Sequence, residues 1–75
     1  MAALPVYSGR QVVTIFAKAG WRQARQRGSH MILVKEGSMV TLSVPAHREI
    51  AKGTLRSLIR SSGMTVEEFL ALAAD

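Results

Sequence analysis

The sequence predicts an α+β fold in which an α-β-β-β-α unit is followed by a short C-terminal helix. Three observations predict it: an amphipathic run that opens at about residue 9, three short strand-like runs between residues 21 and 45, and two helical runs after residue 51. One sheet with its helices packed on one face is a simple arrangement that buries the apolar faces of these runs. We therefore expect a three-stranded antiparallel sheet with helices on one face and the other face open.

The first helix is predicted to begin at about Gly9. The segment Ser8–Gln11 has the Ser-x-x-Gln form of a capping box, in which two side chains satisfy free backbone N–H groups at a helix start. Val12, Phe16 and Ala19 then recur on one helical stripe. Gly20 suits the left-handed residue that commonly ends such a helix.

Three strands follow, separated by glycine-containing turns. Trp21–Arg27 lacks helical periodicity, His30–Lys35 is too short and apolar for a helix, and Met39–Val44 alternates strictly before Pro45. We expect the third strand to hold one apolar face, formed by Val40, Leu42 and Val44.

The last third of the chain predicts two helices. The first starts at about Lys52, ends near Gly63 and carries its apolar residues at helical spacing. Thr65–Glu68 forms a second capping box, and Phe69 opens the apolar stripe of a short closing helix.

Length and composition restrict the possible functions. A chain of 75 residues without cysteine forms one small domain over residues 1–75, with a shallow site and no disulfide or thiolate chemistry. We expect no metal and no cofactor, because histidines and carboxylates are too few and too scattered for a zinc site. No run approaches a membrane span and no leader pattern opens the chain, so we expect a cytoplasmic protein without membrane contact.

The charge of the chain is concentrated in its first half. The formal net charge is +5, and residues 1–37 hold six cations against the single anion Glu36. Residues 38–75 balance four cations with four anions. A basic half favours a polyanion as partner, and the alternative is a solvated surface that maintains solubility.

His30 is the candidate catalytic residue. Histidine can exchange protons near neutral pH, and here Arg25 and Arg27 precede it as candidate phosphate clamps. Gly28 allows close approach of phosphate or a bulge that re-aims the histidine, and Ser29 can bond a phosphate oxygen. The alternatives are an ordinary surface histidine and a glycine that only separates two strands.

A second group of candidates lies further along the chain. His47 follows the third strand and is a possible second acid or base, although a histidine beside charged residues is often merely solvated. Lys52 and Arg56 lie one turn apart on the second helix and can contact phosphate, or can form a solvated face opposite the leucines.

Several motifs in a fixed order resemble the HicA family of bacterial and archaeal toxin ribonucleases, and the likeness covers almost the whole chain. The motifs are Leu4-Pro5 and Ser8-Gly9 before the first helix, Arg27-Gly28-Ser29-His30, Val44-Pro45-Ala46-His47, and Lys52-Gly53-Thr54-Leu55-Arg56 followed by Gly63.

The resemblance implies a double-stranded-RNA-binding-like fold and a metal-independent endoribonuclease that cleaves mRNA, with His30 as its single catalytic histidine. It also implies a HicB-type antitoxin that masks the toxin. The alternatives are a non-catalytic RNA-binding module of the same fold and a domain that binds only protein.

Overall fold

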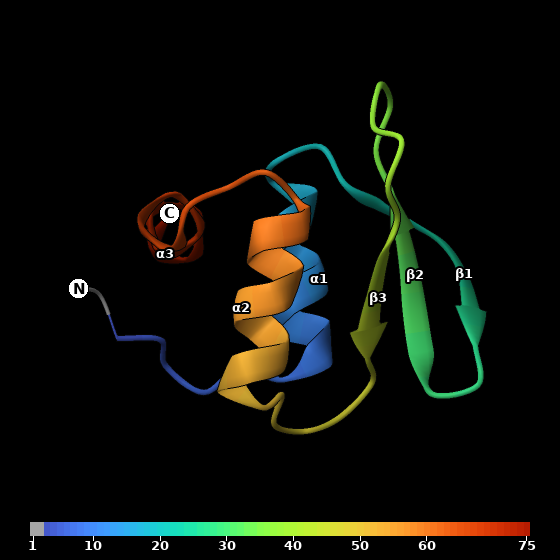
Figure 1. Ribbon diagram of the computed structural model, residues 1–75. Helices are drawn as coiled ribbons and strands as arrows, with labels where there is room; N and C mark the ends of the chain where they lie inside the picture. Colours follow the sequence, from blue (N-terminus) through green and yellow to red (C-terminus); the bar gives the residue numbers. More distant parts are fainter. Residues whose placement is uncertain (1–2) are drawn as a thin grey trace.

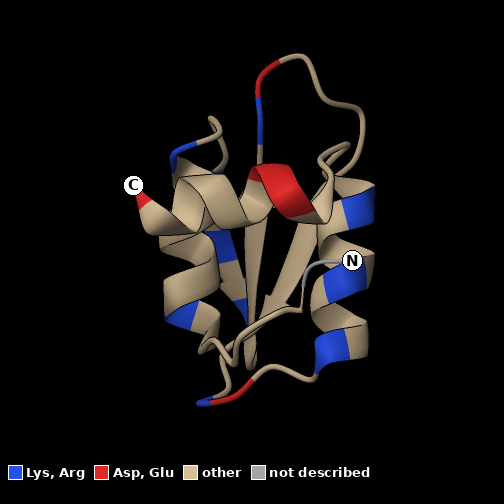
Figure 2. Ribbon diagram, turned by 90° about the vertical axis from the view of Figure 1, so that its left-hand side faces the viewer, with Lys and Arg blue, Asp and Glu red and all other residues tan. Residues whose placement is uncertain are grey.

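The computed structural model describes residues 3–75 and shows an α+β fold in layers (Figure 1). Helices α1 and α2 lie side by side against one face of the sheet, and α3 lies on their far side (Figures 1 and 2). The elements in chain order are α1 (Gly9–Ala17), β1 (Arg22–Arg27), β2 (His30–Val34), β3 (Leu42–Pro45), α2 (Lys52–Ser61) and α3 (Val66–Ala74). The predicted fold class and element order are confirmed.

The sheet is antiparallel, in the order β1-β2-β3. In β2, the central strand, Met31 and Leu33 are 6% and 0% exposed and belong to the core beneath the helices. Because side chains alternate along a strand, His30 and Ile32 point to the opposite face, which none of the described helices covers. This uncovered surface is called the open face below.

The core joins the helix side of the sheet to all three described helices. Phe16 of α1 and Phe69 of α3 are both 0% exposed, and their rings meet edge to face at 5.2 Å. Tyr7 packs against Phe69 at 5.9 Å, and Trp21 packs against Phe16 at 6.4 Å. These aromatic contacts link the segments before and after α1, the C-terminal end of α1 and α3 into one core.

Both predicted capping boxes are present. The Gln11 backbone N–H donates to Ser8 Oγ at 3.1 Å, and the Ser8 N–H donates to the Gln11 side-chain oxygen at 2.9 Å. The same reciprocal pair joins Thr65 and Glu68 at the start of α3. The starts of α1 and α3 therefore follow from local sequence alone.

The predicted start of the third strand is wrong, and so is the place of Val40 on its apolar face, whereas Leu42 and Val44 are buried as predicted. β3 begins at Leu42 instead of Met39, and Val40 is 47% exposed instead of lying with Leu42 in the core. The physical reason is a local turn, because the Val40 N–H donates to Ser38 Oγ and the Ser38 hydroxyl donates back to the Val40 carbonyl oxygen. These bonds hold Val40 in the loop and outside the ladder.

Smaller differences occur at other boundaries. α1 ends at Ala17, and Gly20 has the predicted left-handed backbone with φ of 97°. Trp21 and Lys35 lie just outside β1 and β2, and Pro45 is the last residue of β3. Trp21 is nevertheless only 3% exposed, so its side chain is buried in the core although the residue is not part of a strand. No helix within residues 3–75 is long and apolar enough to cross a membrane.

Lys18 ties α1 to the end of α3, and its removal is expected to lower stability. Its ammonium donates to the carbonyl oxygens of Leu72 and Asp75 at 3.0 and 2.9 Å, where the C-terminal end of a helix dipole favours a cation. For Lys18→Met we expect a loss of about 0.5–1 kcal/mol, because the apolar stem stays and the charge is lost. The loss of stability is measured by thermal unfolding, with the fluorescence of the buried Trp21 as the signal.

The control removes a lysine from the opposite end of a helix dipole. Lys52 is the first residue of α2, so Lys52→Met should not lower the melting temperature. Equal melting temperatures for Lys18→Met and the wild type would contradict the capping role of Lys18.

Candidate nucleic-acid interface

The arginines of β1 lie together on the open face because of a bulge. Arg22 pairs with Val34, Arg25 with Ile32 and Arg27 with His30, and the register shifts between Gln23 and Arg25. Paired residues project from the same face of an antiparallel sheet. Ala24 is the extra residue, so these arginines share the face of His30 although Arg22 and Arg25 are three positions apart.

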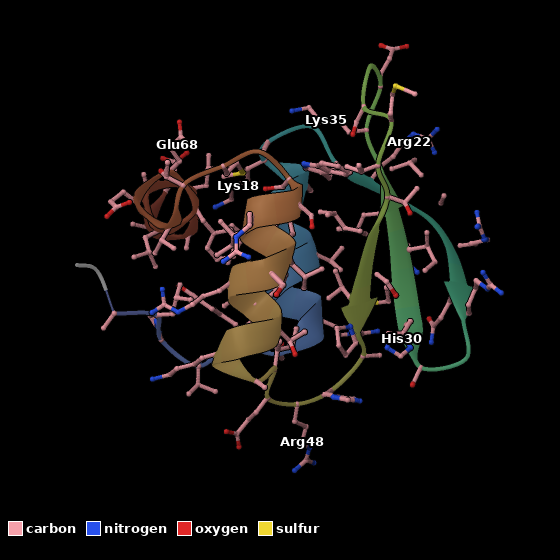
Figure 3. The ribbon with its side chains drawn as sticks, in the orientation of Figure 1. Lys18, Arg22, His30, Lys35, Arg48 and Glu68 are labelled. Carbon is pink, nitrogen blue, oxygen red and sulfur yellow. The ribbon has the colours of Figure 1, made fainter. Side chains whose placement is uncertain are left out.

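His30 begins β2 directly opposite Arg27, at the lower end of the sheet in Figure 3. Gly28 and Ser29 form the connecting two-residue turn, in which Gly28 has φ of 58° and Ser29 has a negative φ. That pattern fits a type II′ turn, which requires glycine at its first central position. The structure thus gives Gly28 the role of turn residue, and the bulge lies at Ala24 instead of at Gly28.

Hydrogen bonds hold the turn that carries His30. The Gln26 side-chain amide donates to the Gly28 carbonyl oxygen at 3.0 Å, and the Ala46 backbone N–H donates to the Ser29 carbonyl oxygen at 2.6 Å. His30 also pairs with Pro45 of β3. The backbone of His30 is therefore held by strands on both sides, while its side chain is exposed.

Gly9 brings the start of α1 against the exit of β3. Its N–H donates to the His47 carbonyl oxygen at 2.9 Å, and a Cβ at residue 9 would collide with the carbonyl oxygen of Pro45. A side chain here would force the two segments apart. The Ser8-Gly9 pair thus combines a helix cap with a close approach that only glycine permits.

His47 lies at a different place from His30. A cavity of about 650 Å³ opens on the helix side of the sheet, and His47 lines it together with Arg10 and Arg48. The His30 side chain belongs to the open face, whereas this cavity includes Met31, which points to the helix side. The two histidines therefore share one end of the molecule but serve different faces.

Lys52 and Arg56 are not brought together with His30. Both belong to α2, whose basic residues form a row along the helix in Figure 2. That helix packs on the side of the sheet opposite to the open face (Figure 1). His30 therefore shares its face of the sheet with Arg25 and Arg27, whereas the α2 row lies on the helix side.

The cations of the first half are not all available to a partner. Lys18 caps α3, and the Lys35 ammonium lies 6.0 Å from the centre of the Trp21 ring. Arg22, Arg25 and Arg27 remain on the open face, and all five acidic residues lie outside the three strands. The open face therefore carries positive charge without acidic neighbours within the strands, which suits a phosphate backbone.

Residues 9–64 match the family model described as the HicA toxin of bacterial toxin-antitoxin. The chain belongs to the HicA toxin family. The match spans most of the chain and includes β1, β2, β3 and α2, and it supports a toxin role with a cognate antitoxin as partner. A comparison with curated proteins gave no match.

The structure of this HicA toxin adds residues that sequence reasoning did not single out. Arg10, Gln23, Gln26 and Arg48 line the cavity with His47. No cluster of three potential metal-binding side chains occurs among residues 3–75. The glutamines could not be found from strict alternation, because the bulge at Ala24 brings two residues that lie three apart onto one face.

Proposed function

We propose that this HicA toxin is a metal-independent endoribonuclease that cleaves mRNA in the cytoplasm, with His30 as its catalytic residue. The observation that carries the proposal is the position of His30 on a positive open face, directly opposite Arg27 and directly after the Gly28–Ser29 turn. A single-stranded RNA can approach this face because no described helix covers it.

The proposed reaction is transesterification within the RNA. A base removes the proton of a 2′-hydroxyl, the 2′-oxygen attacks the adjacent phosphorus, and the bond from phosphorus to the 5′-oxygen breaks as that oxygen takes a proton. The products are a 2′,3′-cyclic phosphate and a 5′-hydroxyl. His30 acts as the base or the acid of this reaction, while His47 on the other face remains a candidate for a second proton-transfer group.

Arg25 and Arg27 are proposed to stabilise the charge of the pentacoordinate phosphorane. Guanidinium groups donate paired hydrogen bonds to phosphate oxygens and keep their charge throughout the reaction. Gly28 and Ser29 bring backbone and hydroxyl groups close to the same phosphate. Lys52 and Arg56 contact phosphates further along a long RNA, from the α2 side.

A HicB-type antitoxin is proposed to inhibit the toxin by covering the open face. The exposed arginines of β1 then predict an acidic surface on the antitoxin. Because the same side chains serve RNA and antitoxin in this account, the two should compete for the toxin.

The test is incubation of purified protein with a defined single-stranded RNA in the presence of a chelator, with RNA binding measured in parallel. We expect binding and cleavage. Binding without cleavage by folded protein would make this chain an RNA-binding module, and absence of both would remove RNA as the substrate.

The β1 arginines are expected to control the salt dependence of RNA binding. For Arg25→Gln and Arg27→Gln we predict weaker binding and a slope of log affinity against log salt that falls by about 0.7 per lost phosphate contact. The control is Lys35→Gln, which removes the same charge at the far end of the sheet (Figure 3). Slopes equal to that of the wild type in both arginine variants would contradict the assignment.

A further inference from the structure

The β1 bulge separates two kinds of side chain. Gln23 pairs with Leu33 and Gln26 pairs with Met31, and both partners point into the core. The two glutamines therefore project to the helix side of the sheet, while the arginines of the same strand project to the open face. One strand thus presents amides on one face and guanidinium groups on the other.

The amides project into the cavity between α1 and β1, called the α1–β1 cavity here. It is a hollow widely open to solvent, and its volume of about 650 Å³ is within the range of small-ligand sites. Arg10 and Thr14 of α1 line one side, Gln23 and Gln26 line the other, and His47 and Arg48 come from the segment after β3. Val13 and Met31 supply apolar surface.

The lining suits a ligand with both a phosphate and a hydrogen-bonding ring. Cations alone would suffice for inorganic phosphate, but the α1–β1 cavity adds two carboxamides and an apolar surface. A glutamine amide offers donors and an acceptor to the edge of a nucleobase, and the apolar surface can pack against the base. Arg10 and Arg48 provide guanidinium groups for the attached phosphate.

The cavity and His30 can be reached by one RNA strand. Among residues 3–75, β1 is an edge strand that pairs only with β2, and the Gly28–Ser29 turn closes the end where His30 lies. The Gln26 amide donates to the Gly28 carbonyl oxygen, so a cavity residue also supports the turn that carries His30. A strand that passes around this exposed edge contacts both faces.

We propose that the α1–β1 cavity binds one nucleotide of the RNA near the cleaved phosphate and that Gln23 and Gln26 contact its base. This inference rests on the proposed endoribonuclease function and makes the cavity a determinant of cleavage sequence. Gln23 is the better residue to test, because Gln26 also holds the turn of His30.

The chain permits a direct test by nuclear magnetic resonance. It has three glutamines and no asparagine, so three pairs of carboxamide signals are expected. Gln11 is an internal control because it caps Ser8 and does not line the α1–β1 cavity. With non-cleavable 2′-O-methyl tetranucleotides of each base, we expect the Gln23 and Gln26 carboxamides to shift, the Gln11 pair to stay, and inorganic phosphate alone to leave Gln23 unchanged.

The variant Gln23→Ala completes the test. We expect it to reduce the preference among the four bases at one position beside the cut by roughly 5-fold or more, as for loss of a base-edge contact. Arg10→Gln should weaken tetranucleotide binding more than the equal charge loss of Lys35→Gln. Unchanged base preference in Gln23→Ala, or a Gln23 carboxamide that no tetranucleotide shifts, would overturn the inference.

These results separate the inference from the proposed function. If the wild-type protein cleaves RNA but the carboxamide signals of the α1–β1 cavity do not shift, only the inference is overturned. If tetranucleotides shift the Gln23 carboxamide signals but the wild-type protein cleaves no RNA, the proposed nuclease activity would be overturned and the nucleotide-binding site would stand. If Arg10→Gln changes only antitoxin affinity, the cavity holds a protein side chain and the inference fails.

Discussion

His30→Ala is expected to lower the single-turnover rate of RNA cleavage by about 10²–10⁴-fold, the usual contribution of a positioned acid or base. The fold should persist, because His30 is exposed at the start of β2 and its backbone pairing needs no imidazole. RNA affinity should change little, because Arg25 and Arg27 remain. The measurement is the cleavage rate in chelator, with circular dichroism and RNA binding recorded on the same sample.

The companion to this variant is His47→Ala, which removes the other histidine of the chain. If only His30→Ala lowers the cleavage rate, His30 is the sole histidine that takes part in the reaction. Comparable losses in both variants would indicate that His47 takes part as the second proton-transfer group. A folded His30→Ala protein that cleaves at the wild-type rate would contradict the catalytic assignment.

Phe69→Ala is expected to be the most destabilising of the substitutions considered. Its ring is 0% exposed and meets the rings of Phe16 and Tyr7, so truncation leaves a cavity where α1 and α3 meet. The expected loss is about 3–5 kcal/mol. In a domain of this size the melting temperature should fall on the order of 15–30 °C.

Phe69→Leu is the matched control, because it keeps most of the apolar volume and should lose far less stability. The result has a wider meaning because Phe69 lies beyond residues 9–64, the span that matches the family. A melting temperature unchanged in Phe69→Ala would show that α3 is dispensable for the fold, contrary to the packing described above.

Local signals in the sequence predicted much of the fold. The capping boxes at Ser8 and Thr65 specify two helix starts through contacts only three residues apart, so neither depends on the rest of the chain. The glycine at residue 28 likewise marks its turn through backbone conformation. By contrast, alternation placed Val40 in the core, because the pattern cannot reveal that Ser38 would hold it in a loop.

The sequence indicates which candidate residues share a face only where those residues are close together in the chain. His30, Arg25 and Arg27 are close in sequence, and the hairpin brings them onto one face. Arg22 and Arg25 share the open face because of a bulge, and no single residue type in the sequence predicts that bulge. The α1–β1 cavity depends on packing between distant segments, so Arg10 and Gln23 carried no signal in the sequence.

The most direct test of the nuclease account compares two strands of the same sequence with purified wild-type protein in chelator. One strand is RNA, and the other carries a single 2′-deoxyribose at the mapped cleavage position. We expect cleavage of the RNA to a 2′,3′-cyclic phosphate and a 5′-hydroxyl, with no cut at the deoxy position, because the attacking oxygen is missing there. Cleavage at the deoxy position, or products with 5′-phosphate ends, would contradict it.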